Sequence, residues 1–321
     1  MSEYKGIFVY SEDKTVSLEL LGKGRQLANE LNADLTCILI GSNVASNTEE
    51  LITGGADKIY VVDNPDLQSF STETYADLIT QLVSKDNPEI FLIGATKRGK
   101  DLAPKIATRL ETGCVTDCVK LDFDPEKRIV KMGRVVYAGK AFALQTCRTK
   151  PQIATVPPRT FERYEDKNRK GQIEKVDIPV KKPVTELVEV HEKAVSGARI
   201  EDANIIICGG RGMKSKEDFK LLEELAEVLQ GQVSCSRPIA ADRGWFTEWV
   251  GLSGHKVKPS LYIACGVSGV IQHVAGIRDS RTIVAINDNP EAPIFSVADY
   301  GIVGNAYEVV PELVKVLKSK K

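Results

Sequence analysis

The sequence has little net charge and no long hydrophobic run. Its 321 residues carry a formal net charge of -1, whereas binding to nucleic acid or to an anionic membrane surface is favoured by a strong basic excess. No uninterrupted apolar stretch approaches the roughly 18 residues of a membrane helix. Residues 1–10 enter a predicted strand almost at once, so we expect neither a signal peptide nor a transit peptide. These absences predict a protein that binds neither nucleic acid nor a membrane.

The seven cysteines show no pattern of pairing. Their number is odd and most of them lie inside apolar strand-like runs, which indicates buried free thiols in a reducing cytoplasm. Cys114 and Cys118 form a C-x3-C pair, but no second ligand pair or neighbouring histidine accompanies them. We therefore expect a cytoplasmic protein without a zinc site.

What the sequence does contain is an alternation of strand-like and helix-like segments up to residue 116. Apolar runs of strand length begin at residues 6, 35, 58 and 89, and helical patterns cover residues 18–31, 47–52 and 75–83. Such alternation favours a parallel sheet with helices on both faces. Four short strand-like runs then follow, at residues 118–124, 129–139, 141–147 and 151–156. We expect these runs to form a β-meander, partly antiparallel, that caps the first domain.

Residues 159–203 are charged, contain several prolines and have few aromatic core residues, so we expect an extended linker. Its basic cluster of Lys167, Arg169 and Lys170 is flanked by acidic residues and is predicted to be a solvated surface. The predicted fold class is α/β in both domains. Residues 1–195 form an N-terminal nucleotide-fold-like parallel-sheet domain with the meander and linker, which contacts a partner, and residues 196–321 form a doubly wound domain.

A turn of small residues lies at the centre of the second domain. Residues 261–265 are an apolar run of strand length that stops at Gly-Val-Ser-Gly (residues 266–269), and residues 270–277 are apolar at helical spacing. Small residues let backbone N–H groups approach a ligand, and a helix N-terminus favours an anion. The turn fits a phosphate-bearing cofactor, with an ordinary strand-to-helix turn as the alternative. Its spacing matches neither the dinucleotide fingerprint G-x-G-x-x-G nor the nucleophile elbow G-x-S-x-G.

Polar residues accompany this turn. Gln272 and His273 occupy the start of the predicted helix, Asn287 and Asn289 follow the strand-like run at 282–286, and Asp299 lies in a later apolar segment. We expect these groups to collect at the carboxyl ends of the strands, where open α/β sheets bind their ligands. A lone histidine such as His273 is more often a structural residue than a functional one.

Arg211 lies between two glycines, after the strand-like run at residues 204–208. A phosphate contact and an ordinary surface arginine are equally consistent with this position. The chain shows no assembled acid/base pair and no nucleophile triad, so nothing in the sequence predicts a stand-alone enzyme.

The strings GVSGVIQHVAGIRDS and TIVAINDNPEAPIFSVADYGIV resemble the FAD-binding domain of the electron transfer flavoprotein alpha subunit. The resemblance covers about forty consecutive residues and extends upstream to the Gly-Gly-Arg-Gly at 209–212 and to Ser236-Arg237. It implies FAD as the cofactor. It also implies that FAD is bound by Arg211, Ser236, Arg237, Val250, Gly251, Leu252, Ser253, Gly266, Ser268, Gly269, Val270, Ile271, Gln272, His273, Asn287, Asn305 and Ala306.

By the same resemblance, Arg211 contacts the FAD, while Ser236 and Arg237 lie against the flavin. The loop at residues 251–254 follows the flavin ring, with the Ser253 hydroxyl near the N5 atom. His273 lies near the flavin O2 atom, where a hydrogen-bond donor stabilises negative charge on the reduced ring. For Arg237 the structural alternative is a salt bridge that holds two loops together.

The sequence departs from the family pattern at three places. Many members carry Gly-Gln-Thr-Gly where this chain has Leu252 and Ser253, so a side-chain amide is missing while a hydroxyl is kept. Asn305 stands where an aspartate is common, which leaves the ribose contact at the adenosine end open. Trp245 and Trp249 are predicted to pack together against the core or a partner subunit, with stacking on the flavin as the weaker alternative.

The resemblance implies electron transport by a heterodimer of this chain with a beta subunit. Electrons would pass from dehydrogenases, such as the acyl-CoA dehydrogenases of fatty acid beta-oxidation, to a quinone or other acceptor oxidoreductase. The sequence leaves open whether the complex is a one-FAD carrier or a bifurcating complex with two FAD molecules. The alternative from another class is a nucleotide-binding regulatory or sensor protein without electron transfer.

Overall fold

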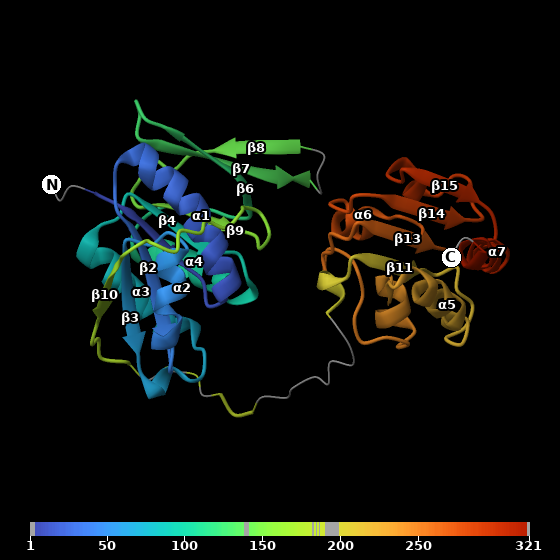
Figure 1. Cartoon of the computed structure of the whole chain (residues 1–321), viewed down its shortest axis with the longest axis horizontal. Helices are drawn as coiled ribbons and strands as arrows, with labels where there is room; N and C mark the ends of the chain where they lie inside the picture. The colour runs from blue at the N-terminus through green and yellow to red at the C-terminus, as the bar shows by residue number, and fades with distance from the viewer. Residues whose placement is uncertain are drawn as a thin grey trace. The chain divides into compact units, whose positions relative to one another are not determined.

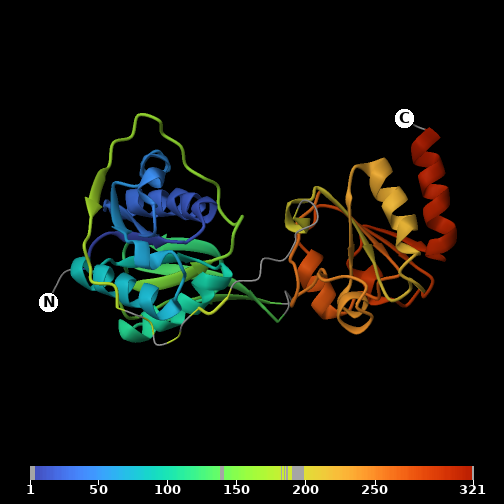
Figure 2. The same ribbon diagram turned by 90° about the horizontal axis from the view of Figure 1, so that it is seen from below.

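Buried apolar strands organise each half of the chain. The computed structural model, drawn in Figures 1 and 2, describes residues 4–137, 141–181, 183, 185, 187–189 and 199–319. The chain divides into unit 1, Met1–Val190, and unit 2, His191–Lys321. The predicted domain boundary between residues 195 and 196 lies outside the described residues.

Unit 1 is built on a seven-stranded parallel sheet in the order β10-β3-β2-β1-β4-β9-β5. Its strands are β1 Ile7–Tyr10, β2 Leu35–Gly41, β3 Lys58–Asp63, β4 Ile90–Gly94, β5 Cys114–Val115, β9 Gln152–Val156 and β10 Gln172–Lys175. Its helices are α1 Lys14–Leu31, α2 Thr48–Thr53, α3 Thr72–Asp86 and α4 Lys97–Arg109, with short 3-10 turns η1 Ala45–Asn47 and η2 Pro65–Leu67. Core residues of α1 and α2 pack on one face of the sheet, and those of α3 and α4 pack on the other. The predicted parallel sheet with helices on both faces is confirmed.

The meander is smaller than the sequence predicted. Strands β6 Cys118–Asp124, β7 Ile129–Val136 and β8 Ala141–Gln145 form an antiparallel three-stranded sheet. The fourth predicted member is instead β9, which pairs in parallel with β4 and β5 inside the main sheet. All five residues of β9 are buried, which is the pattern of a strand covered on both faces rather than of a half-exposed meander strand.

The predicted linker begins later than expected. Strand β10 lies within it and extends the main sheet by pairing in parallel with β3. Arg169, which we expected on a solvated surface, donates hydrogen bonds to the Asp57 carboxylate and to the Ala56 carbonyl. Asp57 also accepts from Arg25 at 2.7 Å and from the Leu35 N–H at 2.8 Å. These long-range contacts hold the segment on unit 1, and sequence composition does not reveal them.

A buried carboxylate connects the meander to the main sheet. Glu89, directly before β4, is fully buried and accepts hydrogen bonds from Arg128 and Lys150. Burial by itself raises the pKa of the Glu89 carboxyl, but the hydrogen bonds from Arg128 and Lys150 outweigh it and leave the pKa below its usual value. The side chain of Gln152 adds a second connection, because it accepts from the Val130 N–H at 2.8 Å and donates to the Arg128 carbonyl at 3.2 Å.

Unit 2 is a doubly wound domain with a five-stranded parallel sheet in the order β12-β11-β13-β14-β15, as predicted. Its strands are β11 Ile205–Gly209, β12 Gln232–Cys235, β13 Leu261–Cys265, β14 Ile283–Asn287 and β15 Tyr300–Val303. Its helices are α5 Phe219–Leu229, α6 Ile271–Ile277 and α7 Ala306–Ser319, with short turns η4 Ile200–Asp202, η5 Pro238–Asp242 and η6 Pro293–Ser296. Helices α5 and α7 pack side by side on one face, and α6 and η6 cover the other (Figure 1).

The strand order of unit 2 reverses once. The chain runs from β11 outward to β12 and then returns to β13 on the other side of β11. The topological switch point therefore lies between β11 and β13, at their carboxyl ends, where open α/β sheets bind ligands. Within the described part of the chain, no helix combines the length and the apolar character needed to cross a membrane.

The Glu89 connection leads to a test of stability. In Glu89→Gln the cations Arg128 and Lys150 lose their carboxylate, and we expect the free energy of unfolding at pH 7 to fall by about 1–3 kcal/mol. Because the pKa of Glu89 is lower in the folded chain, its contribution is present above the unfolded pKa of about 4.3 and is lost as the pH falls below it. Between pH 7 and pH 3.5, the free energy of unfolding measured in urea should fall less for Glu89→Gln than for the unsubstituted chain. The control is Glu126→Gln, since Glu126 is exposed and lies close to Arg128 in the sequence. Equal free energies of unfolding for the two variants would contradict the role of Glu89.

Candidate cofactor site

Two glycine loops meet at the switch point of unit 2. The loop after β11 contains Gly210 and Gly212, and the loop after β13 begins with Gly266. The Gly210 N–H donates to the Cys265 carbonyl at 2.9 Å, and the Gly212 N–H donates to the Gly266 carbonyl at 3.0 Å. A Cβ atom at Gly210 would lie 2.2 Å from the Gly266 carbonyl oxygen. Only glycine permits this backbone-to-backbone approach.

The turn after β13 has a fixed shape. Gly266 and Gly269 have φ angles of +62° and +78°, in the left-handed region that favours glycine. Between them, the half-buried Ser268 accepts from the Ile294 N–H through its carbonyl. Asn287 at the end of β14 is buried, and its side-chain amide donates to the Val267 carbonyl at 2.9 Å. Asn287, which we predicted to contact the cofactor, therefore supports the turn. The sequence did not suggest this second role.

Two arginines leave the carboxyl ends of adjacent strands. Arg211 lies in the loop after β11, and Arg237 follows β12 and Ser236. Ser236 is buried and its N–H donates to the Gly209 carbonyl at 3.0 Å, which keeps this chain segment beside β11. Both arginines are exposed, and neither forms a hydrogen bond or ion pair with any residue that the structure describes. The salt bridge that we considered for Arg237 is therefore not seen among these residues.

The loop at residues 250–255 is held between β12 and α6. The Val250 N–H donates to the Cys235 carbonyl at 2.9 Å, and the Leu252 N–H donates to the Gln272 carbonyl at 2.8 Å. A Cβ atom at Gly276 of α6 would lie 2.5 Å from the Gly251 Cα atom, so the loop and the helix are in backbone contact. These bonds place the loop beside the start of α6.

Exposed side chains project from this loop and from the start of α6. Leu252, Val270 and Ile271 are each about half exposed, although they are large and apolar. Ser253 and Gln272 are exposed polar residues of the same segments. An aromatic ring system can be bound on an apolar surface with a few polar groups around it. Leu252 therefore adds apolar surface to this loop.

His273 is buried beneath this surface, with 4% of its area exposed. Its Nε2 atom lies 3.0 Å from the hydroxyl of Tyr262 on β13, whereas its Nδ1 atom has no hydrogen-bond partner within the described ranges. Burial lowers the pKa of His273 to about 4, although the neighbouring Val250 backbone opposes the shift. The imidazole is therefore neutral near pH 7. Buried polar atoms in folded proteins almost always have a partner, and the Val250 backbone is a polar group beside this imidazole.

Comparison with known proteins identifies the family of this chain. The profile of the electron transfer flavoprotein domain matches residues 8–181, and that of the electron transfer flavoprotein FAD-binding domain matches residues 199–278. An electron transfer flavoprotein subunit alpha of Thermoanaerobacterium thermosaccharolyticum is 42% identical over 100% of both chains. This chain belongs to the electron transfer flavoprotein alpha-subunit family. The resemblance stated from the sequence is confirmed.

Two further relatives illustrate how the family varies. Protein FixB of Clostridium saccharobutylicum is 43% identical over 99% of this chain and 98% of its own. The LctC subunit of lactate dehydrogenase (NAD(+),ferredoxin) of Acetobacterium woodii is 38% identical over 99% of this chain and 78% of its own. The FAD-binding domain of the family confirms FAD as the cofactor.

The geometry of unit 2 fits FAD. Glycine loops in close contact give backbone N–H groups access to a phosphate group, and two unpaired arginines supply positive charge. The unpaired Nδ1 atom of His273 and the half-exposed apolar residues suit a ring with polar edges. All of these features lie at the carboxyl edge of the sheet.

The adenosine-end residues predicted by the resemblance lie further along that edge. Asn305 and Ala306 follow β15, which is separated from β13 by β14. The Asn305 side chain accepts from the Tyr307 N–H at 3.1 Å, so it caps α7, and Ala306 is buried in the core. The prediction for Asp299 is wrong. Its carboxylate accepts from the Ile283 N–H at 2.8 Å, at the amino ends of β14 and β15, on the opposite edge of the sheet.

Trp245 and Trp249 both pack against the core of unit 2 but have different neighbours. Trp245 meets Phe219 edge to face at 6.2 Å and lies under Arg243 at 4.6 Å. The indole N–H of Trp249 donates to the Ser253 hydroxyl at 3.4 Å. Trp249 therefore supports the loop that carries Leu252 and Ser253.

Tyr262 is the functional candidate that the sequence interpretation missed. It is fully buried in β13, and its hydroxyl lies 3.0 Å from the Nε2 atom of His273. A hydroxyl-bearing residue inside the apolar run at residues 261–265 was the available signal, since a buried tyrosine hydroxyl usually has a polar partner.

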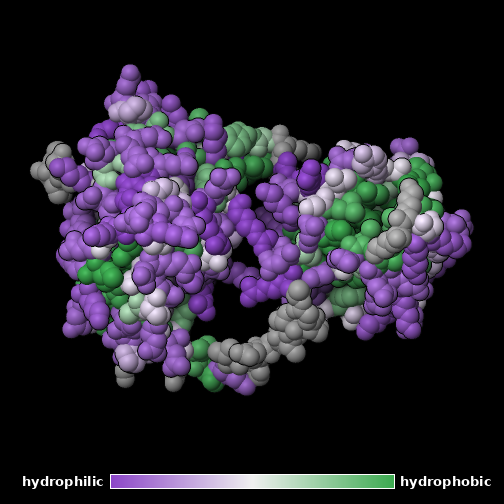
Figure 3. Space-filling view, in the orientation of Figure 1, coloured by the Kyte–Doolittle hydropathy of each residue, from purple (hydrophilic) through white to green (hydrophobic). Residues whose placement is uncertain are grey.

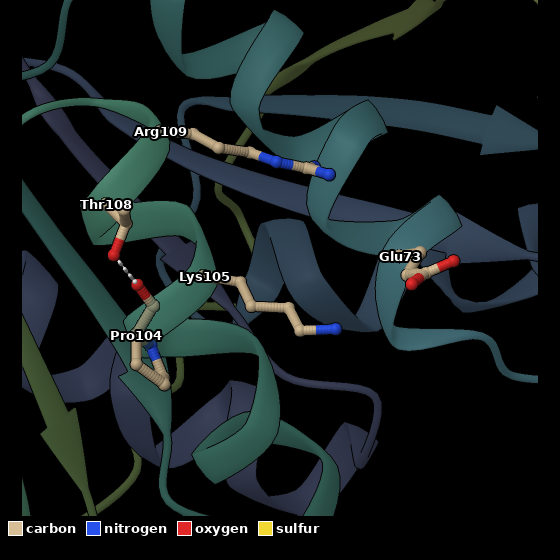
Figure 4. Close-up of a pocket in the computed structure, with 5 residues that line it drawn as sticks. All are labelled: Glu73, Pro104, Lys105, Thr108 and Arg109. Carbon is tan, nitrogen blue, oxygen red and sulfur yellow. Dashed lines mark hydrogen bonds between the residues drawn. The ribbon is translucent and has the colours of Figure 1, made fainter.

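Unit 1 contains a groove that is separate from the predicted FAD-binding residues. It has a volume of about 610 Å3 and is lined by Glu73, Pro104, Lys105, Thr108 and Arg109. Figure 4 shows Lys105 and Arg109 extending across it from α4, while the Thr108 hydroxyl donates to the Pro104 carbonyl at 2.8 Å. None of the residues predicted to bind FAD lines this groove.

The glycine contact can be tested by adding one methyl group. In Gly210→Ala the new Cβ atom meets backbone atoms that cannot rotate away, and we expect the free energy of unfolding of unit 2 to fall by about 1–3 kcal/mol. In the control Gly304→Ala the nearest atom is a Val309 side-chain carbon at 3.1 Å, which can move. Urea unfolding of both variants measures the difference. A Gly210→Ala variant as stable as Gly304→Ala would show that the two loops do not depend on their contact.

Proposed function

We propose that this chain binds FAD at the carboxyl edge of the unit 2 sheet and acts as the alpha subunit of a heterodimer that carries electrons between a dehydrogenase and an acceptor oxidoreductase. One observation carries the proposal. Unpaired polar groups follow three neighbouring strands at this edge, namely Arg237 after β12, Arg211 after β11 and the Nδ1 atom of His273 after β13. A protein leaves such groups unpaired where a ligand completes them.

The phosphate end of FAD would be held by backbone and charge together. The turns at residues 209–212 and 266–269 offer N–H groups, and Arg211 would contact the pyrophosphate with its planar guanidinium. Helix α6 has only seven residues, so the loops and Arg211 contribute more to anion binding than the helix dipole does. Asn305 and Ala306 would contact the adenosine end of the cofactor.

The flavin end would lie over the loop at residues 251–254 and the start of α6. Leu252, Val270 and Ile271 supply apolar contact, and removing this surface from water favours binding. Ser253 offers a hydroxyl, whose orientation is supported by the Trp249 indole. Arg237 supplies a positive field at this end, and His273 presents its Nδ1 atom.

Bound FAD supplies a redox centre that accepts and releases electrons, while the protein sets its position and electrostatics. Arg237 would stabilise negative charge on the bound cofactor through its fixed positive charge, and the neutral imidazole of His273 would do so through a hydrogen bond. Neither contribution changes between pH 6 and pH 8, because arginine stays protonated and the pKa of His273 is about 4.

The proposed donors are dehydrogenases such as the acyl-CoA dehydrogenases of fatty acid beta-oxidation, and the proposed acceptor is a quinone-type oxidoreductase. The name of the Acetobacterium woodii relative points to a second pair, NAD+ and ferredoxin, and so to electron bifurcation. The number of FAD molecules in each heterodimer separates the two arrangements.

The meander sheet of unit 1 is the surface that we propose for the beta subunit. Val135 of β7 pairs with Phe142 of β8, so these side chains and that of Leu144 share one face. Phe142 and Leu144 are 52% and 56% exposed, and Figure 3 shows hydrophobic surface over these strands. Strand β8 is also an edge strand among the described residues. An apolar face at a free sheet edge is typical of a binding surface.

Co-purification with a candidate beta subunit tests the proposed function. We expect a stable one-to-one complex that contains yellow, reducible FAD, whereas the isolated chain should lose FAD on gel filtration because its flavin site is open to water. Leu144→Asp should reduce recovery of the complex about tenfold or more, since a buried charge replaces an apolar contact. Ile173→Asp, a half-exposed apolar residue on β10, is the control. A colourless complex with a bound nucleotide would favour a regulatory protein instead.

Arg237 can be tested through the midpoint potential of the bound FAD. In Arg237→Ala we expect the potential to fall by roughly 10–40 mV, because an exposed charge is partly screened by water. Arg237→Lys keeps the charge and should lower the potential less. Lys258→Ala, an exposed cation before the amino end of β13, should have no effect. If Arg237→Ala changes thermal stability but leaves the potential unmoved, Arg237 has a structural role only.

A further inference from the structure

Tyr262 and His273 form a buried pair inside unit 2. Tyr262 is fully buried in β13, and its hydroxyl lies 3.0 Å from the Nε2 atom of His273. The two rings are 6.1 Å apart between centroids and are tilted by 55°. A neutral imidazole carries one proton, so a donor at one ring nitrogen leaves an acceptor at the other.

Two arrangements of protons satisfy the 3.0 Å contact. In the first, the Tyr262 hydroxyl donates to Nε2, and the imidazole proton is on Nδ1. In the second, Nε2–H donates to the tyrosine oxygen, and Nδ1 carries a lone pair. The first arrangement offers a hydrogen-bond donor at the unpaired Nδ1 atom, whereas the second offers an acceptor.

The surroundings of Tyr262 favour the first arrangement. Burial raises the pKa of the Tyr262 phenol well above its usual value, so the hydroxyl keeps its proton and needs an acceptor. The other group beside this hydroxyl is the thiol of Cys208, whose pKa burial also raises. A neutral thiol sulfur is a weak acceptor, whereas the lone pair of an imidazole nitrogen is a strong one. The phenol therefore donates to Nε2.

We propose that Tyr262 is a positioning residue that fixes His273 in the tautomer with the proton on Nδ1, so that the buried imidazole presents an N–H donor to the bound cofactor. The proposal rests on the proposed function, since it takes His273 to face FAD. Its consequence is a donor that requires no positive charge on the histidine. A neutral imidazole N–H in a dry site can stabilise an oxyanion without a change of protonation.

Nitrogen NMR of the full chain tests the tautomer. The chain has three histidines, so 15N-histidine labelling of the FAD-loaded complex with a His273→Gln reference assigns the signals of His273. We expect Nδ1 to be protonated and Nε2 to be unprotonated. In Tyr262→Phe, which keeps the ring and removes the hydroxyl, the ratio of the two tautomers should shift toward Nε2–H by on the order of tenfold. Tyr60→Phe, a buried tyrosine of unit 1, should leave the ratio unchanged.

The outcomes separate this inference from the proposed function. A proton on Nε2 in the unsubstituted chain, measured without any variant, would overturn the inference, as would a tautomer ratio that does not change in Tyr262→Phe. The midpoint potential of bound FAD is the second readout, and it should fall in both Tyr262→Phe and His273→Ala. If the tautomer shifts as expected but neither substitution changes the potential, His273 does not face the cofactor, and it is the proposed placement of FAD that fails.

Discussion

The backbone contact between two glycine loops constrains the carboxyl ends of the strands at the switch point of unit 2. Gly210 and Gly266 approach so closely that no side chain fits between them. This contact joins the ends of β11 and β13, where the order of the described strands of unit 2 reverses. The two loops share hydrogen bonds on either side of Arg211, which is exposed, and the Leu252 N–H bonds the start of α6 through the Gln272 carbonyl. A bulky residue at either position would separate the elements that carry the polar groups.

Polar groups in this chain fall into two kinds, and the difference indicates their roles. Glu89, Gln152, Asp57 and Asn287 are buried or half-buried, and each is bonded to groups far away in the sequence. Such groups connect segments, because leaving any of them unpaired in the interior would be costly. Arg211, Arg237 and the Nδ1 atom of His273 lack partners within the described residues. They follow three neighbouring strands, β12, β11 and β13, which is consistent with a ligand as the missing partner.

Membership of the electron transfer flavoprotein alpha-subunit family fits this division of labour between the units. Unit 2 holds the glycine loops and the unpaired donors. Unit 1 repeats the parallel α/β architecture but adds a small antiparallel sheet with an exposed apolar face. The additional sheet depends on Glu89 and Gln152, which anchor it to the main sheet, so a buried ionic contact in unit 1 supports the surface that we propose for the partner.

Local patterns in the sequence determined the α/β class, the parallel sheets and the glycine turns, because apolar periodicity and small residues at turns act over short distances. The resemblance to a known family, also carried by short stretches of sequence, indicated FAD as the cofactor. They did not determine that residues 151–156 join the main sheet, that β10 lies inside the predicted linker, or that Asp299 faces the opposite edge. Strand partners and the direction of a polar side chain depend on segments far away in the chain. The bond between Tyr262 and His273 is the clearest case. The sequence drew attention to His273 but not to the tyrosine in the strand. Only the packing of α6 on β13 brings the Tyr262 hydroxyl to one ring nitrogen of His273.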